Sequence, residues 1–151
     1  MTQEDKELLI KDLSARLHYG VKCHFKYGSA EGDVTLGCID NNVARFEYGW
    51  YGRFHVNIDA DYIKPYLRPM SSMTEEENTI FNNISNKGRG YEEDENGWVR
   101  CDSVHTKWGV WPDGCAKLLD YLNSIHVDYR CLIEKGLAIE APEGMYNLKE
   151  K

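Results

Sequence analysis

The spacing of the hydrophobic residues changes at Gly20, and this change limits the fold more than any other feature of the sequence. Before it, Leu9, Leu13 and Leu17 recur every four residues, as on one face of an α-helix. After it, hydrophobic residues alternate with polar ones, as in a half-buried strand. The alternating residues are Val21, Cys23, Phe25 and Tyr27. A helix followed directly by β-structure predicts an α+β fold.

The signals for the two ends of the helix agree with this boundary. Thr2 is a suitable N-cap, and Glu4 and Asp5 place negative charge at the positive end of the helix dipole. Gly20 stands where a glycine commonly ends a helix. The helix is therefore predicted within residues 2–19, with its leucine stripe covering the sheet.

Four more short strands are predicted after the first, and they cover residues 34–38, 43–48, 54–58 and 64–68. Asn41 and Asn42 favour a tight hairpin because asparagine tolerates positive φ. Pro65 limits the last strand to a sheet edge or a strand start. Five short antiparallel strands, with one helical turn between the fourth and fifth, resemble the small Src-homology-3-like β-barrel. Such barrels host many unrelated functions, so this resemblance implies a fold alone.

The second half of the chain is predicted to be mainly helical. Thr74 and Glu77 form the pattern of a capping box, which opens one helix. Pro112 is suited to the first turn of another. Asp128 can cap a third, short helix that ends at Gly136. The C-terminal region is therefore expected to be mainly helical.

The domain organisation follows from these elements. Residues 1–69 are predicted to form the helix and the small barrel, and residues 70–151 the helical region. An irregular insertion, rich in glycine and acidic residues at its start, is expected at 85–112. Within it, 98–103 and 106–111 are predicted to form a short hairpin.

Charge and composition restrict the function classes. The chain has 25 acidic and 18 basic residues, and the excess acid lies in the second half. An acidic chain is poorly suited to neutralising phosphates, which disfavours a sequence-independent nucleic-acid coat. The sequence shows no secretory leader and no apolar run long enough for a membrane span. Its five scattered cysteines are typical of reduced thiols, so a cytoplasmic protein without membrane contact is expected.

Three blocks of the sequence are similar to a known family. They are MTQEDKELLIKDLSARLHYGVK at 1–22, KPYLRPMSSMTEEE at 64–77 and DYLNSIHVDYRCLIEKGLAIEAPEGMYN at 120–147. Together they resemble short uncharacterised proteins of Bacteroides-type gut bacteria and of their prophages and mobile elements. His18 and Cys131 depart from the family pattern, which has Pro and Gly there. The resemblance implies a phage or mobile-element setting and no particular activity or site.

Motifs for catalysis or metal binding are weak. Cys101, His105, Cys115 and His126 lack the paired spacing of a structural zinc site. Cys131 follows Arg130, but neighbouring residues on a helix point in different directions, so activation of the thiol is not expected. No catalytic residue, metal ligand or cofactor site is therefore assigned, and an enzyme is the least favoured of three hypotheses.

Aromatic residues beside cations give the candidate site. Between the third and fourth predicted strands lies a loop with two glycines, and the candidate ligand-binding residues are Tyr48, Trp50, Tyr51, Arg53 and His55. Aromatic side chains in such loops either grip peptides and bases or pack the core. The same two interpretations apply to Trp98, Trp108 and Trp111, for which packing is favoured.

Two binding hypotheses follow. The first is a non-catalytic binding or adaptor protein of mobile-element origin, whose protein partner docks on the loop around Trp50 and Tyr51. The acidic second half favours a basic partner. The alternative is nucleic-acid binding by the same barrel face through Lys22, Lys26, Arg45 and Arg53.

Overall fold

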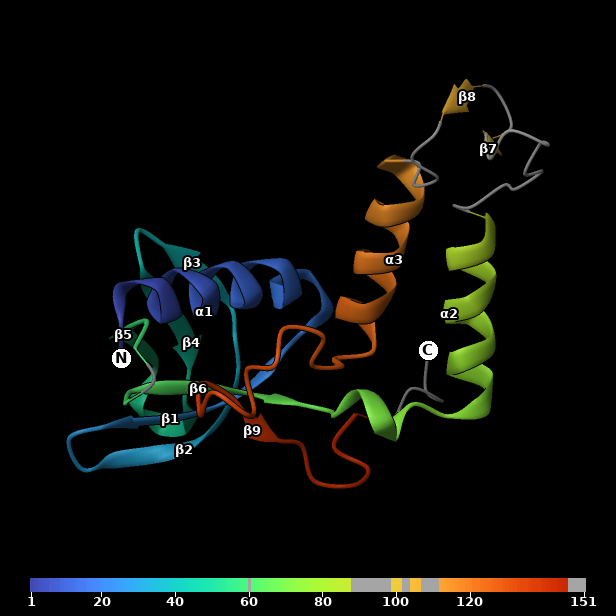
Figure 1. Ribbon diagram of the computed structural model, residues 1–151. Helices are drawn as coiled ribbons and strands as arrows, with labels where there is room; N and C mark the ends of the chain where they lie inside the picture. Colours follow the sequence, from blue (N-terminus) through green and yellow to red (C-terminus); the bar gives the residue numbers. More distant parts are fainter. Residues whose placement is uncertain (60, 88–98, 102–103, 107–111, 147–151) are drawn as a thin grey trace. The chain divides into compact units, whose positions relative to one another are not determined.

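The computed structural model describes residues 1–59, 61–87, 99–101, 104–106 and 112–146 (Figure 1). The chain divides into two compact units. Unit 1 comprises Met1–Ser71 and Asn123–Lys151, and unit 2 comprises Ser72–Leu122. The first segment of unit 1 ends close to the boundary expected after residue 69. The structure differs from that expectation in the C-terminal residues, which join unit 1 rather than a separate helical region.

Unit 1 begins with helix α1 (Gln3–Arg16) and a 3-10 turn, η1 (Leu17–Tyr19). Thr2 caps α1 as predicted, in a capping box with Asp5. Gly20 ends the segment with φ 69°, a left-handed conformation that glycine adopts at little cost. Leu9 and Leu13 are fully buried, so the leucine stripe covers the core as expected.

Seven strands of unit 1 form two sheets, a four-stranded sheet with the order β2-β1-β6-β9 and a three-stranded sheet with the order β3-β4-β5. The strands are β1 (Lys22–Tyr27), β2 (Ala30–Thr35), β3 (Cys38–Asp40), β4 (Val43–Glu47), β5 (Arg53–Asn57), β6 (Ile63–Leu67) and β9 (Ile139–Glu140). All pairings are antiparallel except that of β6 with β9, which is parallel. The α+β class is confirmed.

The five-stranded barrel is not reproduced as predicted, because the described strands of unit 1 lie in two sheets and close no barrel. The second predicted strand, 34–38, is divided between β2 and β3. The amide of Leu36 donates to Val21 O at 3.0 Å in the first sheet. The next amide, that of Gly37, donates to Arg45 O at 3.0 Å in the second sheet. The chain therefore passes from one sheet to the other at this dipeptide.

One hydrophobic core lies between α1 and both sheets. Phe25 of β1 is fully buried, and its ring centroid lies 4.7 Å from that of Phe46 in β4 and 5.6 Å from that of Phe54 in β5. Burying a side chain of this size contributes roughly 1.5–3 kcal/mol. The same cluster includes Leu9 and Leu13 of α1, so the helix and both sheets depend on one another.

Pro65 lies neither in an edge strand nor at a strand start, which differs from the expectation for this residue. β6 lies between β1 and β9. The amide of Lys26 in β1 donates to Tyr62 O at 2.9 Å, one residue before β6 begins. Bonded pairs occur at every second residue of the ladder, so the backbone nitrogen of Pro65 faces away from β1. β9 pairs only with Tyr66 and Leu67, so the missing N–H of Pro65 costs neither ladder a bond.

The short helix expected from Asp128 to Gly136 is replaced by turns. Asp128 still acts as a cap, because its carboxylate accepts hydrogen bonds from the amides of Leu132 and Ile133 at 2.9 and 2.8 Å. Cys131 has φ 58°, which interrupts helical geometry. Gly136, with φ 70°, ends the turns, and β9 follows.

Unit 2 contains helix α2 (Glu75–Lys87), the short strands β7 (Val99–Cys101) and β8 (Val104–Thr106), and helix α3 (Pro112–Ser124), whose last residues enter unit 1. The capping box at the start of α2 is confirmed by Thr74 and Glu77, whose reciprocal hydrogen bonds measure 2.9 and 3.1 Å. β7 and β8 form an antiparallel pair, shorter than the predicted hairpin. Trp98, Trp108 and Trp111 lie outside the described residues.

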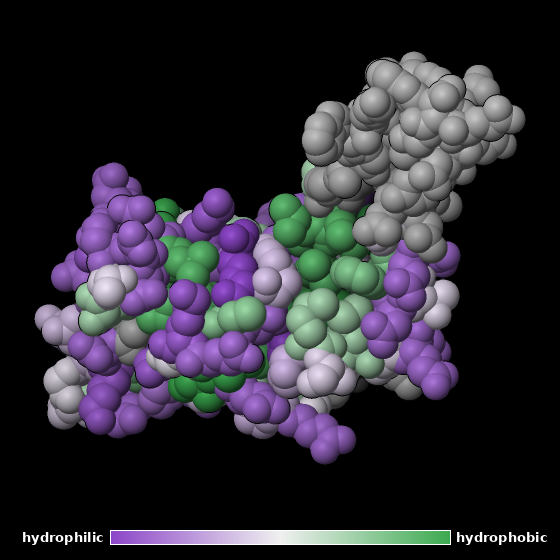
Figure 2. All heavy atoms as spheres, viewed as in Figure 1, coloured by the Kyte–Doolittle hydropathy of each residue, from purple (hydrophilic) through white to green (hydrophobic). Residues whose placement is uncertain are grey.

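The surface is unevenly polar. Figure 2 shows mainly hydrophilic residues over the face of unit 1 in view, and wider hydrophobic areas on unit 2. Ile80 of α2 and Leu119 of α3 are both more than 40% exposed. Among the described residues, no helix combines the length and the apolar character needed to cross a bilayer.

Candidate functional site

The loop between β4 and β5 has a defined conformation. It contains the 3-10 turn η2 (Gly49–Tyr51), with positive φ at Gly49 (47°) and Gly52 (74°). The amide of Tyr48 donates to Gly52 O at 2.9 Å and closes the loop. Backbone positions with positive φ favour glycine, which explains why two glycines flank the aromatic pair in the sequence.

Tyr48 fixes this loop to the rest of unit 1. Its hydroxyl donates to the carbonyl oxygen of Glu31 in β2 at 2.9 Å. Its ring packs edge-on against Phe25, with centroids 4.8 Å apart. A Cβ atom at Gly32 would lie 2.7 Å from the Tyr48 hydroxyl, so the absence of a side chain at this position makes room for the ring. Tyr48 is thus a half-buried anchor of the loop rather than an open binding surface.

Trp50 differs from Tyr48 in its surroundings. Its relative accessibility is 104%, the largest among the exposed hydrophobic side chains of the described residues. The packing interpretation is therefore wrong for Trp50. A fully exposed Trp gives up the favourable burial of a large ring, which is typical of residues that a partner covers. The side chain of Tyr51 lies outside the described part of the chain.

Arg53 and His55 lie on the outer face of β5, where both are exposed. Arg53 Nε is 3.9 Å from Glu47 Oε1, and these side chains are 83% and 81% exposed. A pair this open to water contributes little to stability. Arg53 and His55 thus lie along β5, and Trp50 lies in the loop that precedes this strand.

The cations considered for nucleic-acid binding all have partners. Lys22 Nζ donates to Met145 O at 3.1 Å. Lys26 Nζ lies 3.5 Å from Glu31 Oε2, and Arg45 Nη2 lies 2.6 Å from Asp40 Oδ2. Together with the pair of Arg53 and Glu47, these contacts place a carboxylate or carbonyl oxygen beside every cation of the set. The carboxylates beside Lys26, Arg45 and Arg53 would repel a phosphate at the same place, which weakens the nucleic-acid interpretation.

A second polar cluster lies on the outer face of the four-stranded sheet. His24 is bonded through Nδ1 to Asp33 Oδ1 at 2.9 Å and through Nε2 to Glu31 Oε1 at 3.2 Å. A neutral imidazole can donate to one of these carboxylates, whereas the imidazolium donates to both. The hydrogen bond from His24 lowers the pKa of Asp33 and also that of Glu31. Tyr66 donates to Asp33 at 2.9 Å, and burial together with this bond raises the pKa of Tyr66 to about 12.

Beside this cluster, the sheet face has a shallow hollow of about 310 Å³. His24, Lys26 and Lys64 border it together with Tyr62 and Ile139. Asp61 also lines the hollow, so its border carries a negative charge beside the positive charges of Lys26 and Lys64. It is therefore a weaker candidate for ligand binding than the Trp50 loop.

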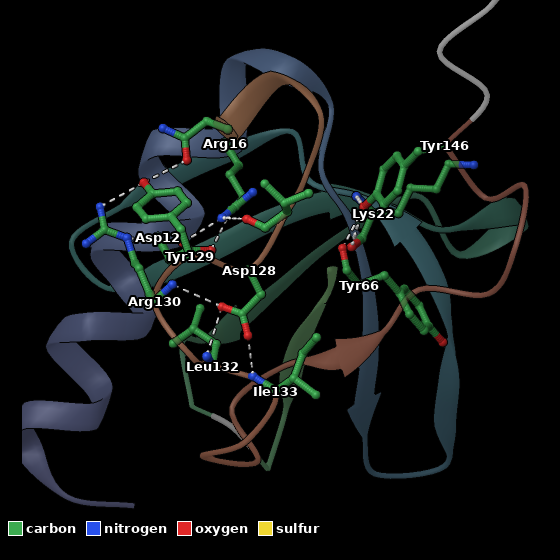
Figure 3. A network of polar contacts seen from close by, with 12 residues as sticks. Asp12, Arg16, Lys22, Tyr66, Asp128, Tyr129, Arg130, Leu132, Ile133 and Tyr146 are labelled. Carbon is green, nitrogen blue, oxygen red and sulfur yellow. Dashed lines mark hydrogen bonds and ion pairs between the residues drawn. The ribbon is translucent and has the colours of Figure 1, made fainter. Parts of the chain in front are cut away.

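A buried ionic network connects α1 to the C-terminal segment of unit 1 (Figure 3). Asp12 and Arg16 are both fully buried, and Arg16 donates to Asp12 through Nε at 2.8 Å and through Nη2 at 3.1 Å. Arg16 Nη2 also donates to Val127 O at 2.8 Å. Arg130 Nε lies 3.3 Å from Asp12 Oδ1 as an ion pair without hydrogen-bond geometry. One carboxylate thus holds two guanidinium groups.

Tyr129 covers this network. The guanidinium carbons of Arg16 and Arg130 lie 5.4 and 4.8 Å from the centroid of its ring, within cation–π range. Its hydroxyl accepts from Arg130 Nη2 at 3.1 Å and donates to Asn123 Oδ1 at 3.0 Å (Figure 3). Arg16 Nη1 and Arg130 Nε are buried without a hydrogen-bond partner, and the other contacts of the network join α1 to the C-terminal segment, so we interpret the network as a support of the fold.

Tyr146 makes a second link between the C-terminal segment and the sheet. Its hydroxyl accepts from the amide of Lys22 at 3.0 Å and donates to Tyr66 O at 2.9 Å (Figure 3). Burial raises the pKa of its phenol. Its ring stacks on that of His126 at 3.9 Å between centroids, so His126 is a buried packing residue.

The three cysteines whose side chains are described, Cys23, Cys38 and Cys131, give no sign of a reactive or metal-binding site. Cys23 is fully buried, and burial raises the pKa of its thiol. Cys38 and Cys131 are exposed. In the described ranges, no group of His, Cys, Asp and Glu residues is arranged to hold a metal ion. The side chains of Cys101, His105 and Cys115 lie outside those ranges.

Comparisons with known proteins add no relative, since no protein-family model, curated protein or solved structure matches the chain.

Proposed function

We propose that this protein is a non-catalytic binding module that holds a protein partner on the loop of residues 48–52. The observation that carries the proposal is the full exposure of Trp50 on a loop that Tyr48 anchors to β2. An aromatic side chain held in one place by its backbone loses little conformational entropy when a partner covers it. This combination is what binding anchors require.

A protein partner is favoured over nucleic acid for electrostatic reasons. The net charge of −7 repels a polyanion at long range. Lys26 and Arg45 already pair with carboxylates on the same faces of the sheets. The acidic second half of the chain favours a partner whose overall charge is basic.

The proposal includes two further points, one on the biological setting, which rests on the sequence, and one on the fold. The setting is that of a phage or mobile element, within the cytoplasm. The two sheets of unit 1 would represent an open form of the Src-homology-3-like barrel. This view is supported by the passage of the chain between the sheets at Leu36–Gly37 and by the pairing of β1 with β6.

A capture experiment tests the partner class. The tagged protein is incubated with lysate of its host, with and without nuclease, and both proteins and nucleic acids in the eluate are identified. A protein retained after nuclease treatment, and lost with Trp50→Ala, is the expected result. Met70→Ala serves as the control, because Met70 is an exposed apolar residue outside the loop.

Nucleic acid in the eluate, with proteins lost on digestion, would support the alternative function instead. In that case the binding would also weaken steeply as salt concentration rises. Binding that depends on salt only weakly, and that requires Trp50, fits the protein-binding module.

A further inference from the structure

We propose that the partner continues from the Trp50 loop along β5 as an added β-strand, so that the open edge of the three-stranded sheet is part of the docking surface. This inference rests on the proposed function, because it specifies how the partner at that loop is held. The partner would bind through backbone hydrogen bonds to β5, and its side chains would match those exposed along this strand.

The register of the β4–β5 ladder shows which backbone groups face the edge. The amide of Tyr48 donates to Gly52 O at 2.9 Å, and the amide of Ile58 donates to Asn42 O at 2.8 Å. Both bonds join residues that are directly opposite each other in the ladder. In an antiparallel pair, such bonded pairs occur at every second residue.

The bonded pairs between these two ends therefore include Phe54 and Val56 of β5, whose N–H and C=O groups face β4. Arg53, His55 and Asn57 face the opposite way. β5 is the last strand in the order β3-β4-β5. Among the residues that the structure describes, no backbone hydrogen bond is made to these three outward-facing residues. They form a row of open donors and acceptors, which is the template for adding a strand.

The other sheet edges of unit 1 are shorter or have an outward-facing backbone group that is already bonded. On β2, the outward carbonyl of Glu31 already accepts the Tyr48 hydroxyl. β3 spans three residues and β9 two. Among these edges, β5 is the longest, at five residues, whose outward-facing backbone groups accept or donate no hydrogen bond within the described residues. Trp50 lies three residues before its first residue, Arg53.

The side chains along this edge indicate the chemistry of the partner segment. Arg53 is the charged residue of the exposed row, and its contact with Glu47 is too open to water to hold it. A carboxylate directly opposite Arg53 on an added strand would form a cross-strand ion pair. The occupant is therefore an extended segment of another protein, with an acidic side chain facing Arg53 and an apolar one for Trp50.

A second copy of this chain fits the edge poorly. An antiparallel pairing of two β5 strands centred on His55 would place His55 opposite His55 and Arg53 opposite Asn57, so that no carboxylate meets a cation. The net charge of −7 on each copy adds long-range repulsion. Self-association is therefore an outcome that the test must be able to detect.

The test uses random linear peptides displayed as a library and selected on the immobilised full chain. Selected peptides are synthesised, and their Kd is measured for the wild type, Trp50→Ala, His55→Ala and His55→Pro. Proline at position 55 removes an outward-facing N–H and leaves the β4 ladder intact, whereas alanine keeps that N–H. Amide exchange of Arg53, His55 and Asn57 is followed with and without peptide.

The expected peptides carry one acidic residue, opposite Arg53, and one apolar residue for Trp50, without a net negative charge overall. Trp50→Ala and His55→Pro should each weaken binding by about tenfold or more, and His55→Ala should weaken it less than His55→Pro does, because alanine keeps the outward-facing N–H. Amide exchange at Arg53, His55 and Asn57 should slow in the complex. If His55→Pro lowers the unfolding temperature, Asn57→Pro provides the same blocked edge, and the exchange data on the wild type still decide.

The remaining outcomes separate this inference from the proposed function. One outcome is that peptides require Trp50 for binding, yet bind His55→Pro as well as the wild type and leave the amides of Arg53, His55 and Asn57 unprotected. That result would reject strand addition at β5 and retain binding at the Trp50 loop. A failure to select any peptide would reject strand addition at β5. Partner binding at the Trp50 loop would then still be tested by capture from host lysate. Exchange that slows with protein concentration, without peptide, would make a second copy the occupant and overturn the stated partner.

Discussion

The Tyr48 hydroxyl lies 2.9 Å from the carbonyl oxygen of Glu31, and this hydrogen bond joins the loop after β4 to the edge of β2. The bond matters because the loop presents Trp50 to solvent without any packing of the Trp ring itself. The rigidity of the candidate site thus comes from its neighbour Tyr48. Substitutions around Tyr48 should change the loop, while substitution of Trp50 should change binding alone.

Gly32→Ala should destabilise unit 1. The new Cβ would lie 2.7 Å from the Tyr48 hydroxyl and 2.8 Å from a ring carbon, so the ring must move from its seat. Overpacking of this kind costs about 1–3 kcal/mol. Urea unfolding measures the change in free energy, and the same substitution in a Tyr48→Ala background should cost much less. Equal costs in the two backgrounds would show that the Tyr48 ring is not the obstacle.

Asp12→Ala should be among the most damaging substitutions in unit 1. It leaves Arg16 buried without its carboxylate, and loss of one partner of a buried pair costs about 3–5 kcal/mol. Glu7→Ala on the same helix removes an exposed carboxylate and should cost less than about 0.5 kcal/mol. Chemical denaturation of the two variants makes the comparison.

The Asp12 substitution also has a local signature. Arg16 and Arg130 connect Asp12 to the segment around Val127, so amide exchange at Leu132 and Ile133 should accelerate more than exchange in β4. Uniform acceleration across unit 1 would contradict a specific link between α1 and the C-terminal segment.

Asp33 should contribute to the pH dependence of stability. Its pKa in the folded state is lowered below the ordinary value of 3.8, chiefly by the hydrogen bond from His24. Its contribution is therefore fully present above the unfolded-state pKa and is lost as pH falls through the folded-state pKa. Over that acid range, the wild type should lose more stability than Asp33→Asn, modestly because the carboxylate is more than half exposed. Parallel losses in the two proteins would rule out this contribution.

Tyr66 should ionise late in an alkaline titration. Burial and the hydrogen bond to Asp33 raise the pKa of its phenol to about 12. Asp33→Asn removes the negative charge and should bring this pKa closer to the ordinary value of 10. The phenolate resonance of Tyr66 by NMR reports the change, and a pKa unaffected by the substitution would assign the whole shift to burial.

Local sequence signals predicted the helix caps and the tight hairpin. The caps at Thr2 and Thr74 and the positive-φ hairpin at Asn41 and Asn42 depend on neighbouring residues, so they can be read from the sequence. These features need no knowledge of distant contacts. For Trp50 the sequence left packing and binding open, and the structure decides for exposure.

The features that were missed depend on residues far apart in the chain. Asp12 and Arg16 have the spacing of an ordinary surface ion pair, yet both are fully buried because Val127 and Arg130 close over them. Their positions three residues after Leu9 and Leu13 place them beside the buried stripe, which was the one available signal. The turn at Cys131 depends on positive φ in a non-glycine residue, which propensity does not predict.

The role of Trp50 as the anchor of the partner is tested by comparing partner capture by the wild type and by Trp50→Ala, with unfolding temperatures taken on the same preparations. Because the Trp50 ring is fully exposed, its removal should change the free energy of unfolding by less than about 0.5 kcal/mol. Trp50→Ala should lose the captured protein and keep an unchanged unfolding temperature. Undiminished capture by Trp50→Ala, or a large fall in its unfolding temperature, would show that Trp50 is not an exposed anchor of the partner.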